Sequence, residues 1–461
     1  MPRFPFLDNQ RRCFAFSVLV LFATTTVRAD EYKSPLMRMD LAEGDSVVFL
    51  GDSITHQCLY TQYVEDFYYT RYPGRKIKFH NAGVGGATAR DALDRFDRDV
   101  AAYKPKYVTV LLGMNDGGYK PYDDGTFQTY RTGMTELVTK IREIGAVPIL
   151  MTPTMYDARA ARPRGAKNPP LNIEMYNSTL AYYGAWLRET AVEQGAGFVD
   201  MYSLLNNLTL RARETDPAFT LIKDAVHPDP PGQLVMAFAL LHDLDAGQGG
   251  LFDIRAEVGA APEVKVSLKS PTGGNISGPR WDAASLEFTF GASALPFAIP
   301  AEAEPGARLV YLGHSLDRGV LSVTGLPKGS YELTIDGQAV GDYDNAALAQ
   351  GIELEENAKT PDYRQALQVA ELNKIRNEGP VRALRNEWSQ MQQFYRLQRA
   401  AKANPDNADL AKNAEAQAKK VEGLEERIAR QEEAAAEIER KILEIVPAPH
   451  KYRLAKVEPR K

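Results

Sequence analysis

The stretch Ser46-Val-Val-Phe-Leu-Gly-Asp-Ser-Ile-Thr55 is an apolar, β-branched run followed at once by a turn that carries a serine. The run Ser46–Leu50 has the composition of a buried strand. Gly51 lets the chain turn sharply, and Ser53 at the tip of such a turn is exposed enough to attack a carbonyl carbon. Alone, the Gly51–Ser53 motif is a weak indication, because a strand-to-helix turn uses the same residue types to cap a helix.

Short apolar runs and helical stretches alternate from Asp45 to about Ala246, which predicts an α/β fold with a parallel sheet covered on both faces. In such sheets the reactive groups gather at the carboxyl ends of the strands. Helical periodicity fills the segments between strands, for example Phe127–Ile144 and Tyr176–Gln194. The expected strands are Ser46–Leu50, Lys76–His80, Tyr107–Leu112, Val147–Met151 and Gly197–Asp200.

Two further motifs directly follow predicted strands. In Asn81–Gly86 the glycines free a backbone N–H to point into a pocket, as an oxyanion site requires. In Gly113–Asp116 the amide of Asn115 is able to donate to a developing oxyanion. The alternatives are a flexible loop for the first motif and an ordinary turn for the second.

A fourth motif, Asp224-Ala-Val-His227-Pro228, lies late in the predicted α/β region. Serine needs a base close by at neutral pH, and an imidazole suits that role. An aspartate three residues earlier is placed to bond the other ring nitrogen and fix its tautomer. A metal site of Asp224, His227 and Asp229 is the rival, but no second histidine lies at ligand spacing, since His242 is fifteen residues further on.

These four blocks together resemble the SGNH hydrolases, also called the GDSL esterase/lipase superfamily, over about Asp45 to Ala246. The resemblance implies a three-layer α/β/α sandwich with a five-stranded parallel sheet (the flavodoxin-like SGNH fold) and a serine esterase that needs no metal or organic cofactor. Thr55 stands where the nucleophile elbow of a standard α/β-hydrolase has its second glycine, which argues against that fold. The implied site consists of Ser53 as nucleophile, His227 as base, Asp224 as its orienting carboxylate, and Ser53, Gly86 and Asn115 as oxyanion donors.

The N-terminus has the features of a signal peptide. Arg11 and Arg12 precede an apolar run from Phe14 to Val27, and Val27-Arg28-Ala29 has the small-x-small pattern of a cleavage site. We therefore expect cleavage near Ala29 and export to the periplasm or the medium, with no membrane span afterwards; an uncleaved anchor is the alternative. Without residues 1–29 the chain has 51 basic and 59 acidic residues, a balance with no overall attraction to nucleic acid or anionic lipid.

Cysteine usage excludes an internal disulfide from the exported chain. Cys13 leaves with the signal segment, so Cys58 has no partner within the chain. A thiol nucleophile at Cys58 is conceivable, but nothing cationic adjoins it in sequence. A buried small side chain on a helix is therefore the preferred interpretation.

The length of 461 residues predicts two or three domains. Beyond Gly249 the pattern changes to short alternating segments separated by turn residues, and Asp336-Gly337 indicates a hairpin. We expect a small antiparallel β module with strands at Val264–Leu268, Leu286–Phe290, Leu309–Leu312 and Tyr331–Ile335. The predicted division is a signal peptide (1–29), the catalytic domain (30–248), the β module (249–355), a helical region (356–446) and a tail (447–461).

The helical region is broken in the middle by Asn404-Pro-Asp-Asn407, which predicts two long arms. An αα-hairpin that packs on itself or on the catalytic domain is the simplest interpretation. Self-association through an intermolecular coiled coil is the alternative. The second arm has a heptad seam at Val421, Leu424, Ile428, Gln431, Ala435, Ile438, Ile442 and Ile445.

The substrate is expected to be a small-molecule or polysaccharide ester, most simply an acetylated carbohydrate. The loops Gly117–Gly125 and Asp157–Lys167 are strongly polar, unlike the apolar surround of a lipase site. A lysophospholipase or thioesterase, and a binding or scaffold protein with an inactive SGNH domain, are the alternatives. Several aromatic and polar side chains follow the motifs, and such side chains are suited to binding sugar rings. Packing within the fold explains the tyrosines equally well. The residues are Tyr60, Tyr63, Tyr119, Tyr122, Tyr156 and Arg162.

Overall fold

The computed structural model describes residues 36–161, 174–247 and 249–457. The predicted signal segment and Arg162 therefore lie outside the described residues. At the centre is a five-stranded sheet in the order β2-β1-β3-β4-β5, in which every pair of neighbours is parallel. The prediction of an α/β sandwich around a five-stranded parallel sheet is confirmed. The strands are β1 (Ser46–Gly51), β2 (Lys78–Gly83), β3 (Tyr107–Leu111), β4 (Val147–Met151) and β5 (Gly197–Val199).

Both faces of this sheet are covered because its strands are apolar on both sides. In β1, Val47 and Phe49 point into one hydrophobic core, whereas Val48 and Leu50 point into the other. Helices α2, α8 and α9 contribute to the first core and α3 and α4 to the second, while α7 contributes to both. The helices are α1 (Ser53–His56), α2 (Leu59–Arg71), α3 (Ala89–Asp99), η1 (Ala101–Tyr103), α4 (Asp124–Glu143), α5 (Ala158–Ala161), α7 (Tyr176–Gln194), α8 (Met201–Ala212) and α9 (Pro230–Asp243).

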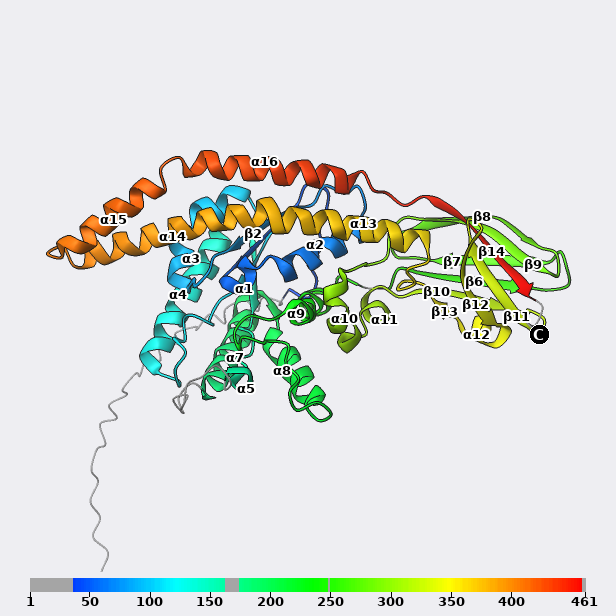
Figure 1. The fold of residues 1–461 in the computed structure, drawn as a ribbon, viewed down its shortest axis with the longest axis horizontal. Coiled ribbons are helices and arrows are strands. Elements are labelled where there is room, and N and C mark those ends of the chain that lie inside the picture. Colours follow the sequence, from blue (N-terminus) through cyan, green and yellow to red (C-terminus); the bar gives the residue numbers. More distant parts are fainter. Residues whose placement is uncertain (1–35, 162–173, 248, 458–461) are drawn as a thin grey trace, which may run out of the picture.

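The β module lies at one end of the molecule and consists of two sheets, ordered β13-β10-β6-β7 and β12-β11-β14-β9-β8 (Figure 1). Its pairings are antiparallel except for β6 with β10, which run parallel. Its elements are β6 (Phe252–Val258), β7 (Val264–Lys269), β8 (Gly274–Trp281), β9 (Ser285–Ala292), β10 (Gly319–Thr324), β11 (Ser330–Ile335), β12 (Gln338–Asp344), α12 (Asn345–Gln350), β13 (Ile352–Glu353) and β14 (Pro449–Val457).

The hairpin expected at Asp336-Gly337 is confirmed, because β11 ends one residue before this pair and β12 begins one residue after it. Asp336 and Gly337 have φ values of 50° and 78°, as a two-residue type I′ turn requires. The strand expected at Leu309–Leu312 is wrong. Leu309 belongs to α10 (Glu304–Val310), and Leu312 begins α11 (Leu312–Leu316).

The reason for this error is that a four-residue apolar run does not distinguish a strand from a buried helix segment. Helix α10, which follows η3 (Ala301–Ala303), packs on α9 of the catalytic domain. A side chain at Gly306 would place its Cβ 2.2 Å from the carbonyl oxygen of Pro231, so glycine there permits the close approach.

The C-terminal residues are also placed differently from the expected tail. Residues 449–457 form β14, which pairs with both β9 and β11 in the middle of the second sheet. His450 on this strand hydrogen-bonds Asp336 of the β11–β12 turn, with 2.6 Å between its Nδ1 and Oδ2. The helical region is therefore inserted between β13 and β14 of the β module.

Five helical segments form the insertion, and the break at residues 404–407 lies between α14 and α15 as predicted. The long helices run along the catalytic domain from the β module (Figure 1).

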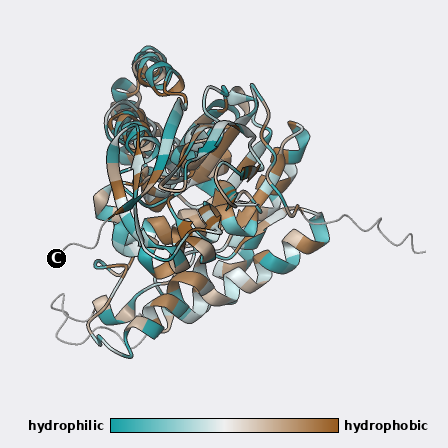
Figure 2. Ribbon diagram, turned by 90° about the vertical axis from the view of Figure 1, so that its right-hand side faces the viewer, coloured by the Kyte–Doolittle hydropathy of each residue, from teal (hydrophilic) through white to brown (hydrophobic). Residues whose placement is uncertain are grey.

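Figure 2 shows hydrophobic residues gathered in the interior of the molecule. Leu424 and Ile428 of the heptad seam are buried in the second core, and Ile442 in the first, so the seam packs within the chain. The segments are α13 (Pro361–Arg376), the π-helical η4 (Asn377–Val381), α14 (Arg382–Ala403), α15 (Ala408–Lys420) and α16 (Leu424–Leu443).

Within the described ranges, no helix combines the length and the apolarity that a membrane crossing requires.

Candidate active site

The loops that follow β1, β2 and β3 meet at the carboxyl edge of the parallel sheet, as the strand pattern predicts. Asn115, after β3, connects the other two loops, because its Nδ2 lies 3.3 Å from Oδ2 of Asp52 and 3.1 Å from the carbonyl oxygen of Ala87. Asp116 adds a second link, since its Oδ1 accepts a hydrogen bond of 2.8 Å from the backbone N–H of Ala89. The predicted site segments are therefore brought together.

Ser53 is the first residue of α1, and only Asp52 separates it from the end of β1. The preceding Asp52 caps this helix, with its Oδ1 2.9 Å from the backbone nitrogen of Ile54, so the serine hydroxyl is not used for capping. Gly51 is required for space and not for a special φ, since a Cβ there would lie 2.1 Å from Oγ1 of Thr55. The Ser53 hydroxyl points instead to His227, with 2.8 Å between Oγ and Nε2.

His227 is held on its other side by Asp224, with 2.6 Å between Nδ1 and Oδ2. The second carboxylate oxygen accepts the backbone N–H groups of His227 and Val226 at 2.6 and 2.9 Å. Partial burial raises the pKa of Asp224, but these backbone and imidazole hydrogen bonds outweigh it, so the pKa lies below its ordinary value. Asp224 is therefore a carboxylate at neutral pH and orients the imidazole.

The turn between Asp224 and His227 is held in an uncommon backbone conformation. Ala225 has a φ of 73°, a region that costs a non-glycine residue about 1–2 kcal/mol. Its carbonyl oxygen accepts the backbone N–H of Asp157 at 3.0 Å. The buried carboxylate of Asp157 is in turn held by Arg213 and Thr220, both at 2.6 Å. This buried group after β4 therefore supports the turn that carries the histidine.

Gly86 lies in the loop after β2 with a φ of 70°, which favours glycine. Its backbone N–H has no hydrogen-bond acceptor among the described residues. The neighbouring groups of this loop do have partners, and several of them come from α14, including Gln392 and Arg396. Sequence reasoning missed these two residues, because they lie about 300 positions from the loop and belong to no recognisable motif.

Two buried carboxyl groups lie beneath the site. Burial raises the pKa of Asp52 to about 7, although the Ile54 N–H opposes this, and the nearby Asp116 charge adds to the rise. Burial likewise raises the pKa of Asp116 to about 7. Near neutral pH a part of the molecules therefore carries these groups in the uncharged form.

The aromatic residues singled out from the sequence behave differently from one another. Tyr60, Tyr63 and Tyr156 are buried in the core, so they are not available to stack on a sugar ring. Tyr122 is exposed but packs against Phe127 and Tyr182. Tyr119 is the one that reaches the site: it is partly exposed, and its hydroxyl lies 3.4 Å from Oδ1 of Asn115.

The geometry does not support the two alternatives raised by the sequence, a thiol nucleophile at Cys58 and a metal site that includes Asp229. Cys58 is buried directly before α2, and burial raises the pKa of its thiol to about 12, which removes the thiolate that a nucleophile requires. Asp229 forms an ion pair with Lys223 at 3.4 Å. Among the described residues, no group of three or more His, Cys, Asp or Glu side chains is arranged to hold a metal ion.

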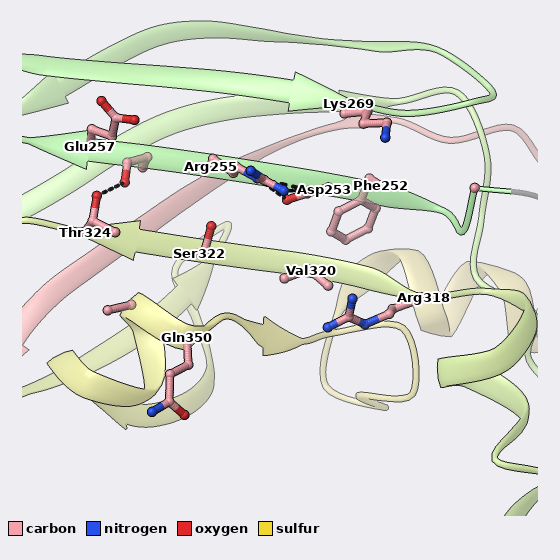
Figure 3. Close-up of a pocket in the computed structure, with 13 residues that line it drawn as sticks. Phe252, Asp253, Arg255, Glu257, Lys269, Arg318, Val320, Ser322, Thr324 and Gln350 are labelled. Carbon is pink, nitrogen blue, oxygen red and sulfur yellow. Dashed lines mark hydrogen bonds and ion pairs between the residues drawn. The ribbon is translucent and has the colours of Figure 1, made fainter.

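A separate cavity of about 480 Å³ lies in the β module, over β6, β7 and β10 (Figure 3). Two of its charged side chains pair with each other, since Arg255 binds both carboxylate oxygens of Asp253. Arg318 binds Glu353, which does not line the cavity, at 2.6 Å. None of the residues predicted for catalysis lines this cavity.

The chain is similar to known proteins over the region that contains the candidate site. Residues 49–235 match the GDSL-like Lipase/Acylhydrolase family. An acetylxylan esterase from Geobacillus stearothermophilus is 28% identical over 229 residues, which are 45% of this chain and 96% of that protein. An uncharacterized lipoprotein, YqeF of Bacillus subtilis (strain 168), is 40% identical over 76 residues, 16% of this chain and 30% of that protein.

The solved structure described as "BT4096 a gut microbial diltiazem-metabolizing enzyme" superposes with a TM-score of 0.78 and 26% identity, covering 92% of this chain and all of that one. The chain therefore contains a domain of the SGNH/GDSL hydrolase superfamily, over residues 49–235, and is a carboxylic ester hydrolase.

Proposed function

We propose that the chain hydrolyses esters through a covalent acyl-enzyme on Ser53, with His227 as base and Asp224 as the carboxylate that orients it. One observation carries this proposal: Asp224, His227 and Ser53 form a continuous chain of hydrogen bonds of 2.6 and 2.8 Å, although Ser53 lies 174 positions from His227. Such a chain activates a hydroxyl that is otherwise a weak nucleophile at neutral pH.

In the first step Oγ of Ser53 bonds to the carbonyl carbon while its proton passes to Nε2 of His227. The carbonyl π electrons move to oxygen and give a tetrahedral oxyanion. Its collapse restores the carbonyl, breaks the bond to the alcohol oxygen, and returns the proton from His227 to the leaving alcohol. Water then attacks the acyl-enzyme by the same sequence, releasing the acid and the free serine.

The oxyanion is assigned to three donors: the backbone N–H groups of Ser53 and Gly86 and the amide of Asn115. The free N–H of Gly86 supports this assignment. In the free enzyme the Asn115 amide bonds Ala87 at 3.1 Å and Asp52 at 3.3 Å. We propose that the longer of these bonds is exchanged for the oxyanion. A partly uncharged Asp52 lowers the cost of that exchange, because a neutral carboxyl holds the amide less strongly than a carboxylate does.

For the substrate class we propose acetyl esters of carbohydrates. The acetylxylan esterase relative supports this assignment, although at low identity. The partly exposed Tyr119 beside Asn115 offers an aromatic face and a hydroxyl, which suit a sugar ring. The diltiazem-metabolizing relative adds diltiazem as a small-molecule alternative.

A panel of four compounds separates the substrate classes: acetylated xylan, diltiazem, a lysophosphatidylcholine and an acyl-coenzyme A thioester. Initial rates of acid release are measured at equal concentrations of ester groups. We expect the acetylated xylan to be hydrolysed fastest, with acetate as the product. Faster hydrolysis of the lysolipid or the thioester would instead assign the enzyme to the lysophospholipase or thioesterase alternative.

We also propose that the protein is exported, on the charge and hydropathy pattern of residues 1–29 and on the lipoprotein relative. The intact mass of the protein recovered from outside the cytoplasm of its native host checks this. A mass that includes residues 1–29 would contradict cleavage near Ala29.

A further inference from the structure

The loop residues Gly85 and Gly86 have four backbone hydrogen-bonding groups, and three of them are occupied. The N–H of Gly85 donates to Nδ1 of His56 at 3.2 Å, its carbonyl oxygen accepts from Nε2 of Gln392 at 3.0 Å, and the carbonyl oxygen of Gly86 accepts from Arg396 at 2.6 Å. The remaining group, the N–H of Gly86, has no acceptor among the described residues. It is the group that catalysis is proposed to use.

All three partners depend on α14 of the C-terminal insertion. Gln392 and Arg396 belong to this helix and lie one turn apart. His56 is itself held by α14, since its Nε2 lies 3.1 Å from Oδ1 of Asn386. Burial lowers the pKa of His56 to about 4, so at neutral pH its ring is uncharged and Nδ1 is free to accept the Gly85 N–H. The insertion therefore contacts two of the three occupied groups directly and holds the partner of the third, His56.

Gln392 holds the peptide unit that contains the oxyanion donor. The carbonyl of Gly85 and the N–H of Gly86 belong to one planar trans peptide, so they point in opposite directions. A hydrogen bond that directs the Gly85 carbonyl toward α14 consequently directs the Gly86 N–H away from α14. Rotation of this peptide would turn the N–H away and present a carbonyl oxygen in its place.

The environment of Gln392 fits such a role. Its side chain is only 4% exposed, and its Oε1 has no hydrogen-bond partner among the described residues. Among the described residues, the side chain of Gln392 therefore forms one hydrogen bond, to the Gly85 carbonyl oxygen of the loop. Arg396 is anchored independently, because it also forms an ion pair with the buried carboxylate of Asp91 on α3.

We propose that Gln392 is a positioning residue for ester hydrolysis, which sets the Gly85–Gly86 peptide so that the Gly86 N–H faces the oxyanion. This inference rests on the proposed function of Ser53 and Gly86. It gives the C-terminal insertion a part in catalysis: α14 completes the active site of a domain that ends about 140 residues earlier in the chain.

The test compares Gln392→Glu and Gln392→Met with the wild type in steady-state hydrolysis of 4-nitrophenyl acetate. Methionine removes the donor at similar size, and we expect kcat to fall about tenfold, which corresponds to the loss of one neutral hydrogen bond. Glutamate also places an acceptor against the Gly85 carbonyl, and we expect kcat to fall about a hundredfold, approaching the loss of an oxyanion donor. KM should stay within twofold in both variants.

The matched control is Gln417→Glu. Gln417 is a buried glutamine of the same insertion, 5% exposed, whose Nε2 donates to the carbonyl oxygen of Gln390 at 3.0 Å. Among the described residues its hydrogen bonds go to Gln390 and not to the loop. We expect kcat of this variant to stay within twofold of the wild type. Melting temperatures of all the variants separate an effect on the loop from a general loss of stability.

The outcomes distinguish this inference from the proposed function. Suppose that the wild type is active, that Ser53→Ala is inactive, and that kcat is unchanged in both Gln392 variants. This result would overturn the role of Gln392 and leave the proposed function standing. Equal losses of kcat in the Gln392 and Gln417 variants, in proportion to their melting temperatures, would also overturn it. If Gln392→Glu does not fold, the kcat of Gln392→Met decides. No hydrolysis by the wild type would count against the proposed function instead.

Discussion

Replacement of Ser53 by alanine is expected to lower kcat for ester hydrolysis by about 10⁴- to 10⁶-fold. Alanine removes the oxygen that is proposed to form the acyl-enzyme but leaves the backbone N–H donors in place. The residual rate then comes only from water, assisted by the remaining site. Because the hydroxyl bonds only His227 among the described residues, the melting temperature should change little. Steady-state kinetics with 4-nitrophenyl acetate and a thermal melt measure both effects.

A suitable control is Ser267→Ala, which removes an exposed hydroxyl on β7 of the β module. We expect this variant to keep the full rate. If Ser53→Ala retained more than a tenth of the wild-type kcat, Ser53 would not be the nucleophile.

Replacement of Asp99 by alanine is expected to lower the free energy of unfolding by about 3–5 kcal/mol. Asp99 accepts hydrogen bonds from Arg95 at 2.5 Å and from two nitrogens of Arg385 at 2.8 and 2.5 Å, and the side chains of all three residues are 0% exposed. Burial raises the pKa of Asp99, but the two guanidinium groups outweigh it and hold the pKa well below its ordinary value. Without the carboxylate, two buried cations lose their counterion.

The same ionic group supports the active-site strands. Arg95 donates to the carbonyl oxygens of Gly51 and Ala82, and Arg385 donates to that of Gly83 at 2.9 Å. We therefore expect Asp99→Ala to lower activity as well as stability. Urea unfolding at pH 7 measures the stability change through the midpoint concentration.

The control for this variant is Asp97→Ala, two residues away on the exposed face of α3. Its carboxylate is 82% exposed and pairs with Lys140 at 3.3 Å, a surface ion pair worth at most about 1 kcal/mol. Equal urea midpoints for the two variants would show that the buried ionic group does not stabilise the fold.

The central sheet is predictable from the sequence because its signals are local. Apolar β-branched runs mark the five strands, and the rule that parallel strands end at one edge is enough to place Ser53 and Asn115 near each other. Strand β2 begins two residues later than expected, since Lys76 and Ile77 precede the pairing with β1. Such local signals do not show how the helical insertion packs. Its seam is equally typical of an intermolecular coiled coil, whereas Leu424 and Ile428 lie in the core of their own chain.

The residues of the candidate site also differ in whether a local sequence signal predicts them. The motif around Ser53 and the Asp224–His227 pair carry their chemistry in sequence, and the structure joins them by hydrogen bonds. Gln392 and Arg385 carry no such signal, because their roles depend on contacts across about 300 residues of chain. The tyrosines mislead in part, since residue type alone does not tell a buried ring such as Tyr60 from an accessible one such as Tyr119.

Covalent trapping of the nucleophile tests the proposed role of Ser53 most directly. The wild-type protein is incubated with an alkyl fluorophosphonate, and the modified peptide is identified by mass spectrometry. We expect one adduct per chain, on Ser53, and none on the Ser53→Ala variant. An unlabelled wild type, or an adduct on a residue other than Ser53, would contradict it.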